Sequence, residues 1–362
     1  MKIGIVGLPN VGKSTLFNAL TRSKGAMAAN YPFCTIDPNI GVVEVPDERI
    51  KKLVELVKPA KVIPAIVEFV DIAGLVKGAS EGEGLGNQFL AHIRECDAIA
   101  QVIRAFEDEN VVHVHGNVDP RRDIEILETE LILADLQTVQ KRLQKAKNEA
   151  KSGDKKKQEY ADLVEKIAKA LGEGKKIIDY PLTDEEKEAS KDLHLLTAKP
   201  IFYIANVGEK ELGSFNSELL QQKLGLTPNK KLIPISAKIE EELGELSEEE
   251  AKVFLQSLGL KETGLNSLIR AAYETLGLLT YFTAGPKEVR AWTIHRGDSA
   301  PQAAGVIHSD FEKGFISAEV IAYDDYVACG SETIVKEKGK MRVEGKNYEV
   351  CDGDVMHFRF NV

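Results

Sequence analysis

The stretch Gly7-Leu8-Pro9-Asn10-Val11-Gly12-Lys13-Ser14-Thr15 decides the fold of this chain. Its two glycines enclose four residues, and lysine and serine follow the second glycine, which is the phosphate-loop pattern. The apolar run 3–6 before it is typical of a buried parallel strand, and Leu16 and Leu20 follow at helical spacing. Such a loop points backbone N–H groups at phosphate oxygens where a helix begins. This setting favours a nucleoside triphosphate site over a chance glycine-rich turn.

Within this loop, the residues expected to contact the nucleotide are Asn10, Val11, Gly12, Lys13, Ser14 and Thr15. The pattern predicts that Lys13 reaches the β- and γ-phosphates and that Ser14 binds Mg²⁺. Lys13 is also a predicted catalytic residue, because its charge stabilises the phosphoryl group during transfer.

A second motif, Asp71-Ile72-Ala73-Gly74, ends the apolar strand predicted at 67–71. In phosphate-loop proteins the aspartate of this motif supports Mg²⁺ and the glycine amide senses the γ-phosphate. DxxG alone is a common pattern, but it is a strong signal at a strand end downstream of a phosphate loop. Thr35 lies in a segment that could bring a hydroxyl to the metal, although a simple turn is the alternative there. The predicted metal ligands are therefore Ser14, Thr35 and Asp71.

Two later strand ends complete the expected site. Asn206-Val207-Gly208-Glu209 stands where guanine-specific proteins carry Asn-Lys-x-Asp, and Ser236 follows the last predicted strand of the sheet. Here valine replaces the lysine, and Glu209 replaces the aspartate that accepts hydrogen bonds from guanine. A carboxylate would repel adenine N1, whereas Asn206 or a backbone carbonyl could accept from the adenine amino group. A site loses affinity when its hydrogen bonds are unmet, so the sequence predicts ATP over GTP.

The residue after the DxxG motif is Leu75, where Ras-type switches carry the glutamine that orients the attacking water. Leucine cannot bond to water, so either turnover is slow and a partner assists, or another side chain acts. His113 and His115 are the candidates, since a neutral imidazole can orient or polarise water. A histidine that is merely packed in a loop is an equally good interpretation from the residues alone.

Length and composition set the broad class. The chain has 362 residues, 43% hydrophobic and 29% charged, with a formal net charge of −10. These values are ordinary for a globular protein with two or three domains. No stretch approaches the roughly 20 apolar residues of a membrane helix, and no secretory signal opens the chain. The cysteines are scattered, at positions 34, 96, 329 and 351, and predict reduced thiols. We expect a cytoplasmic protein that does not enter a membrane.

The order of the predicted elements indicates an α/β fold with an insertion. A βαβ rhythm runs over 1–118 and resumes over 200–279, so both segments are assigned to one phosphate-loop, Rossmann-like nucleotide domain. Between them, 119–199 carries two helical stripes separated by a polar turn at 151–158, which pair most economically as an antiparallel coiled-coil arm. Residues 280–362 change to short strands and turns, which indicates a small C-terminal β-rich domain.

Taken together, these motifs resemble the Obg-like ATPases, the YchF branch of the Obg-related phosphate-loop proteins in the TRAFAC class. The resemblance covers essentially the whole chain. Its most specific segments are 7–15, 30–39, 71–79 and 82–90, and the family's degenerate base motif matches 206–209. The segments 281–283, 307–314 and 352–355 resemble its C-terminal TGS domain, a ubiquitin-like β-grasp unit.

The resemblance implies slow hydrolysis of ATP in preference to GTP, and binding to the ribosome and its large subunit. It implies a cleft suited to RNA or protein between the arm and the TGS domain. The family's proposed catalytic histidine matches His113 and not His115. Mg²⁺ ligands carry over to Ser14 and Thr35, the Val207 backbone matches the adenine contact, and Asn10 matches an asparagine that holds K⁺ in some relatives. We expect a monomer.

Two charged segments bear on partners. Eight Lys or Arg lie between 141 and 157, against Glu149 and Asp154, so the tip of the arm is basic. It is either a contact for ribosomal RNA phosphates or a solvated coiled-coil end. The acidic run at 240–250 predicts a solvated surface. Two alternatives to an ATPase remain open: a GTPase with relaxed base specificity, and a nucleotide-stabilised ribosome- or RNA-binding module with negligible turnover.

Overall fold

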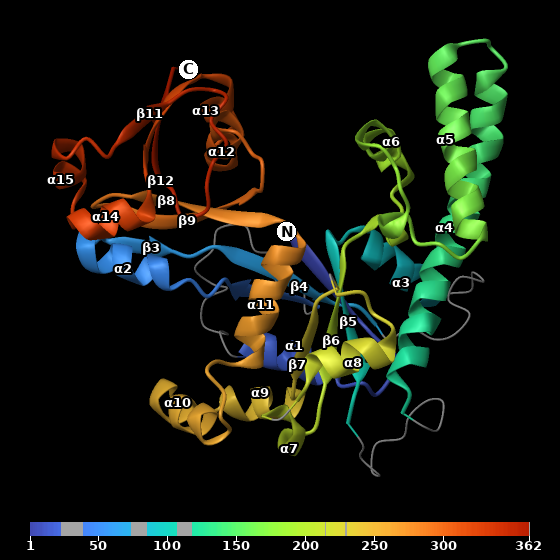
Figure 1. Ribbon diagram of the computed structural model, residues 1–362, viewed down its shortest axis with the longest axis horizontal. Helices are drawn as coiled ribbons and strands as arrows, with labels where there is room; N and C mark the ends of the chain where they lie inside the picture. Colours follow the sequence, from blue (N-terminus) through green and yellow to red (C-terminus); the bar gives the residue numbers. More distant parts are fainter. Residues whose placement is uncertain (23–38, 74–84, 107–117, 214, 229, 362) are drawn as a thin grey trace. The chain divides into compact units, whose positions relative to one another are not determined.

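The computed structural model describes residues 1–22, 39–73, 85–106, 118–213, 215–228 and 230–361 (Figure 1). They form two compact units. The first comprises 1–41 and 68–268, and the second comprises 42–67 and 269–362. Within the described residues, no helix is both apolar enough and long enough to cross a membrane.

The first sheet has six strands in the order β2-β4-β1-β5-β6-β7, and most of its residues belong to the first unit. The strands are β1 (Lys2–Val6), β2 (Ile40–Glu44), β4 (Ile66–Asp71), β5 (Ala98–Arg104), β6 (Ile201–Asn206) and β7 (Leu232–Ile235). β1 pairs in parallel with β4 and β5, and β5, β6 and β7 continue in parallel. Every residue of β5 and β6 is buried, as expected for central parallel strands. Their carboxyl ends therefore converge on one edge, where ligands bind in such sheets.

Helices complete the first unit. They are α1 (Lys13–Arg22), α3 (Leu85–Arg94), α6 (Asp184–Ala189), α7 (Glu209–Leu212), α8 (Ser217–Leu224), α9 (Ala237–Leu243) and α10 (Glu248–Ser257), together with the arm helices. α11 (Gly264–Thr275) begins in this unit and ends in the second. The parallel α/β architecture predicted from the sequence is confirmed.

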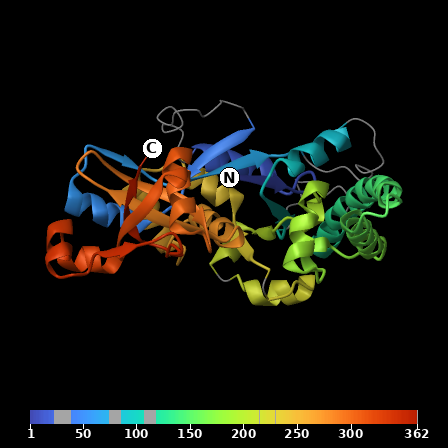
Figure 2. The same ribbon diagram turned by 90° about the horizontal axis from the view of Figure 1, so that it is seen from above.

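The predicted arm is present as α4 (Pro120–Ala150) and α5 (Lys155–Gly172), which lie side by side in Figures 1 and 2. Asp119 and Asp154 cap their N-termini by accepting backbone hydrogen bonds. A buried core, with Val139, Val164 and Ile167 at its centre, joins the helices. The connecting turn is shorter than predicted, because the Asp154 cap starts α5 at Lys155.

Asp135 anchors the arm to the segment that returns to the sheet. Its carboxylate, 1% exposed, accepts from the backbone N–H groups of Leu196 and Thr197 at 2.8 Å and from the Thr197 hydroxyl at 2.7 Å. Burial raises the pKa of Asp135, and the three hydrogen bonds lower it. A buried carboxylate with three donors is costly to expose or replace, so it fixes the base of the arm.

The second unit is a mixed six-stranded sheet in the order β11-β10-β12-β8-β9-β3. Its strands are β3 (Lys61–Ile63), β8 (Leu278–Ala284), β9 (Glu288–His295), β10 (Phe315–Ile321), β11 (Arg342–Glu344) and β12 (Val355–Phe360). The hairpin β8–β9, the parallel pair β8–β12 and the antiparallel strands β10 and β11 give the β-grasp order. Helix α12 (Ala300–Ile307) packs its alanines against Tyr281 and Phe315. The remaining helices are α2 (Glu48–Val57), α13 (Ser309–Lys313), α14 (Tyr323–Cys329) and α15 (Glu332–Glu337).

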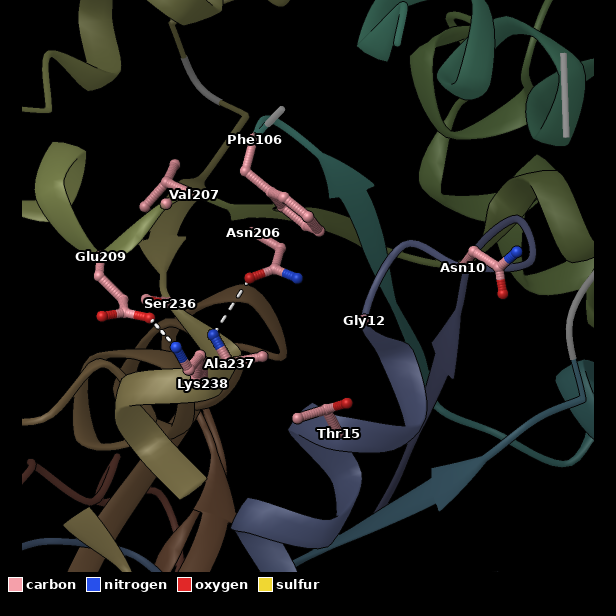
Figure 3. Close-up of a pocket in the computed structure, with 11 residues that line it drawn as sticks. Asn10, Gly12, Thr15, Phe106, Asn206, Val207, Glu209, Ser236, Ala237 and Lys238 are labelled. Atoms are coloured by element: carbon pink, nitrogen blue, oxygen red, sulfur yellow. Dashed lines mark hydrogen bonds and ion pairs between the residues drawn. The ribbon is translucent and has the colours of Figure 1, made fainter. Parts of the chain in front are cut away.

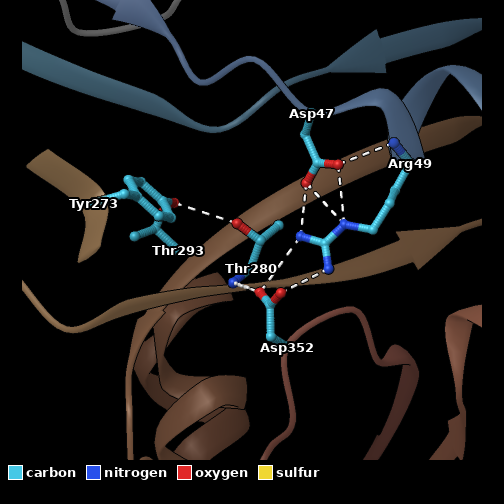
Figure 4. Close-up of polar contacts among 6 residues, drawn as sticks. All are labelled: Asp47, Arg49, Tyr273, Thr280, Thr293 and Asp352. Carbon is cyan, nitrogen blue, oxygen red and sulfur yellow. Dashed lines mark hydrogen bonds and ion pairs between the residues drawn. The ribbon is translucent and has the colours of Figure 1, made fainter. Parts of the chain in front are cut away.

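The segment 42–67 was not predicted to join the C-terminal residues. Its strand β3 pairs in parallel with β9 and extends the β-grasp sheet. Arg49 fixes the segment, because its guanidinium bonds Asp47 at 2.8 Å and Asp352 at 2.7 Å (Figure 4). Asp352 also accepts from the Thr280 backbone N–H at 2.8 Å. A partly buried ion pair that also bonds the backbone is geometrically specific, so this segment is held to the C-terminal sheet.

Glu240 departs from the predicted solvated acidic run, since its side chain is only 2% exposed. Helix α9 turns it inward, where Oε1 accepts from the Gly264 backbone N–H at 2.7 Å. Its Oε2 has no hydrogen-bond partner among the described residues. Burial raises the pKa of Glu240 to about 7, although bonds from the Gly264 and Leu265 backbone oppose the rise. The carboxyl therefore joins α9 to the start of α11.

This burial predicts a pH-dependent stability. The folded state retains the Glu240 proton up to about pH 7, whereas an unfolded glutamate releases it near its ordinary value of 4.5. The contribution of this group is therefore most favourable below pH 4.5, falls as pH rises to about 7, and is constant above. We measure the free energy of unfolding in urea for Glu240→Gln and for wild type. We expect the variant's value minus the wild-type value to rise by up to about 3 kcal/mol between pH 5 and pH 8. A pH-independent difference would contradict the assignment.

Candidate nucleotide site

A cavity of about 460 Å³ opens at the carboxyl edge of the first sheet. Its lining residues are Asn10, Gly12, Thr15, Phe106, Asn206, Val207, Gly208, Glu209, Ser236, Ala237 and Lys238 (Figure 3). The structure thus brings together the phosphate loop and the two later strand ends, which lie far apart in the sequence. This volume is typical of a pocket for a small ligand.

The phosphate loop depends on two residues with positive φ angles. Asn10 has a φ of 64° and Gly12 a φ of 92°, a region that glycine adopts freely and that asparagine adopts more readily than most other residues. A Cβ atom at Gly12 would lie 2.1 Å from Asn206 Nδ2. Only glycine therefore allows the loop to approach the end of β6 this closely before α1 begins at Lys13.

Asn206 joins the phosphate loop to the strand ends beside it. Its Nδ2 donates to the Val11 carbonyl at 2.9 Å, and its Oδ1 accepts from the Ala237 backbone N–H at 3.1 Å. The residue is only 6% exposed. The sequence favours this side chain, or a backbone carbonyl, as an acceptor for the adenine amino group. In the structure its amide holds two loops in register, and its contact with adenine stays a prediction.

Lys13 and Asp71 meet at the phosphate side of the site. The Lys13 ammonium forms a direct ion pair with the Asp71 carboxylate, and Lys13 is only 9% exposed. The end of β4 thus lies against the start of α1, which also carries the exposed hydroxyl residue Ser14. A hydroxyl and a carboxylate are the hard oxygen donors that Mg²⁺ prefers, so this donor set fits the predicted metal.

Glu209 and Lys238 face each other across the opposite part of the cavity. Their Oε1 and Nζ atoms are 2.5 Å apart (Figure 3). Glu209 is the first residue of α7, directly after Gly208, and Lys238 lies in the first turn of α9. Both side chains are substantially exposed, so the pair contributes little to stability. It nevertheless places a positive charge beside the carboxylate at the altered base motif.

Comparison with known proteins establishes the family. A Bacillus subtilis protein named ribosome-binding ATPase YchF is 55% identical over 362 residues, covering 99% of this chain and 99% of that protein. The chain belongs to the YchF family. The protein of that name from Escherichia coli O157:H7 is 53% identical, over 100% of this chain and 99% of its own length.

The solved structure of the Schizosaccharomyces pombe YchF GTPase matches with a TM-score of 0.88 at 42% identity, over 99% of this chain and 97% of that one. A family model described as a 50S ribosome-binding GTPase matches residues 2–134. The YchF GTPase C-terminal model, described as a protein of unknown function (DUF933), matches residues 278–361. The YchF assignment therefore rests on relatives and a solved structure that match nearly the whole chain, and on the C-terminal family model.

Phe106 is a lining residue that the sequence analysis missed. It follows β5 at the same sheet edge as the predicted residues, and its ring is directed toward Asn206 in Figure 3. The only available signal was an aromatic residue two positions after a buried strand, a position at which loops between β-strands and helices commonly carry ligand contacts. An aromatic ring in a nucleotide cavity offers a surface on which a base can stack.

Five further residues of the sequence analysis fall outside the described part of the chain. They are Thr35, Gly74, Leu75, His113 and His115. The roles assigned to Thr35, Gly74 and His113 in this YchF family member stay predictions.

Proposed function

We propose that this chain is a P-loop ATPase that binds ATP with Mg²⁺, hydrolyses it slowly and associates with the large ribosomal subunit. The observation that carries the proposal is the cavity in which the phosphate loop and the altered base motif meet. The name ribosome-binding ATPase YchF, carried by relatives about 55% identical over nearly the full length, supports it. RNA within the large subunit is the partner that the basic arm favours.

The preference for adenine over guanine follows from the altered base motif. Guanine needs a carboxylate that accepts from N1–H and the 2-amino group. At this position Glu209 is paired with Lys238, and Val207 replaces the usual lysine. Unmet hydrogen bonds penalise a ligand strongly, so GTP is the weaker ligand. The Val207 backbone is the proposed adenine contact, beside Ser236 at the cavity wall.

The phosphate end supplies the proposed chemistry. Mg²⁺ would be held by Ser14 and Thr35 with support from Asp71, and when bound it would neutralise charge on the phosphate oxygens. Lys13 stabilises the phosphoryl group, the Gly74 amide contacts the γ-phosphate, and His113 orients water. Asn10, exposed in the loop, is the proposed K⁺ ligand.

The proposed organisation accompanies this function. We assign 1–118 and 200–279 to the nucleotide domain, 119–199 to the arm and 280–362 to a TGS domain, although 42–67 and 269–279 group with the second compact unit by their contacts. The protein is proposed to be a cytoplasmic monomer.

The turnover mechanism is tested with His113→Ala. We expect this variant to lose at least about 100-fold in ATP turnover, the usual contribution of a general base, with its ATP affinity within about two-fold of wild type. His115→Ala is the matched control and should keep wild-type turnover. Phosphate release and calorimetry measure the two quantities. Unchanged turnover in His113→Ala would contradict the role of this histidine, and no turnover by wild type with or without ribosomes would favour a binding module.

The arm carries the proposed ribosome contact. Lys141 and Lys145 lie four residues apart on α4, and Lys156 and Lys157 lie in the first turn of α5. All four are exposed, and none has an ion-pair partner among the described residues. By contrast, Lys147 pairs with Glu165 at 2.7 Å. Lysines without acidic partners can bind phosphate groups without first breaking an ion pair.

We expect the double variant Lys141→Glu with Lys145→Glu to weaken binding to the isolated large subunit roughly ten-fold at 150 mM salt and to flatten its salt dependence. The matched control replaces two exposed lysines elsewhere in the first unit, Lys223 and Lys252, with glutamate. It therefore changes the net charge by the same amount. Cosedimentation over a salt series measures both. Equal losses in the two variants would show an effect of net charge rather than an interface on the arm.

A further inference from the structure

Arg104, the last residue of β5, is a large charged side chain that is only 1% exposed. It pairs in register with Asn206 on β6, and the next backbone N–H, that of Ala105, donates to the Asn206 carbonyl at 2.8 Å. The backbone of Arg104 therefore lies immediately beside the residue that joins the two loops. A buried charge at a ligand-binding edge requires a structural or functional reason.

Arg104 makes two contacts with Phe106. Its Cζ atom lies 4.5 Å from the centroid of the Phe106 ring, and its Nε donates to the Phe106 carbonyl at 3.2 Å. The first contact orients the ring, and the second fixes the backbone that carries it. Phe106 lines the cavity and Arg104 does not, so Phe106 is the member of this pair that a ligand in the cavity can touch.

We propose that Arg104 is a positioning residue that holds Phe106 as a stacking surface for the purine of the nucleotide. This inference rests on the proposed function, because it assigns the base to the cavity that Phe106 lines. A cation held against one face of an aromatic ring is attracted to it, and a buried pair of this kind is stronger than an exposed one. The other face of the ring is then presented to the base in a single orientation.

The chemistry of arginine suits this role. Its planar guanidinium can stack on the ring while Nε donates to a carbonyl, whereas the compact ammonium of lysine cannot make both contacts from one position. Stacking is tolerant of base identity, since every purine has a π face. Replacing Arg104 is therefore expected to weaken the binding of ATP and of GTP equally and to leave the binding of phosphates without a base unchanged.

The test compares three ligands, each with Mg²⁺: ATP, GTP and inorganic tripolyphosphate, which has phosphates but no base. For Arg104→Met we expect roughly ten-fold losses in ATP and GTP affinity and tripolyphosphate affinity within about two-fold of wild type. Arg104→Lys should be intermediate. Phe106→Ala should reproduce the pattern of Arg104→Met. Tyr203→Phe, a fully buried position on the adjacent strand that loses only a hydroxyl bond to Glu128, controls for a general loss of stability.

The outcomes separate the inference from the function on which it rests. If wild-type protein binds ATP no more tightly than tripolyphosphate, the base site itself is refuted. If wild type binds ATP more tightly than tripolyphosphate and Arg104→Met keeps the same ratio of affinities, the role of Arg104 is wrong and the proposed function stands. Parallel losses for all three ligands would show that Arg104 supports the fold rather than the base surface, which also overturns the inference.

Discussion

The two hydrogen bonds of the Asn206 side chain are the constraint on which the rest of the site depends. They join the Val11 carbonyl of the phosphate loop to the Ala237 N–H of the following strand end. Because Asn206 is nearly inaccessible, an unpaired amide there would be costly. The bridge also explains Gly12, since any Cβ at that position would collide with the Asn206 amide.

The site around this constraint has two sides with different side chains. Lys13 and Asp71 meet on the phosphate side, where charge is developed and neutralised during phosphoryl transfer. Phe106, Val207 and the Glu209–Lys238 pair lie on the base side. The phosphate side keeps the features common to phosphate-loop proteins, whereas the base side departs from the guanine pattern. In the proposed function, nucleotide choice and phosphate chemistry are therefore assigned to separate residues of one site.

Local signals in the sequence made much of the fold and of the phosphate loop predictable. The phosphate loop and the apolar strands each reflect contacts between near neighbours, and the structure confirms the fold they predict. The helical stripes likewise predicted the arm. Resemblance to a known family supplied the β-grasp unit, because the short strands after residue 280 have no distinctive periodicity of their own.

The features that the sequence did not predict depend on contacts between distant residues. Glu240 lies in an acidic run, yet its burial is decided by the start of α11. The pairing of β3 with β9 joins residues more than 200 positions apart. The three residues of β3 are too few to show a strand pattern in the sequence. The bridging role of Asn206 and the position of Phe106 arise only when separate strand ends meet at one edge.

The most direct test of the account is an experimental structure of the protein with Mg²⁺ and a non-hydrolysable ATP analogue. The account predicts phosphates enclosed by the backbone N–H groups of residues 10–15, with Lys13 on the terminal phosphate and adenine stacked on Phe106. A purine bound outside the cavity between Phe106, Val207 and Lys238, or phosphates away from the N-terminus of α1, would contradict it.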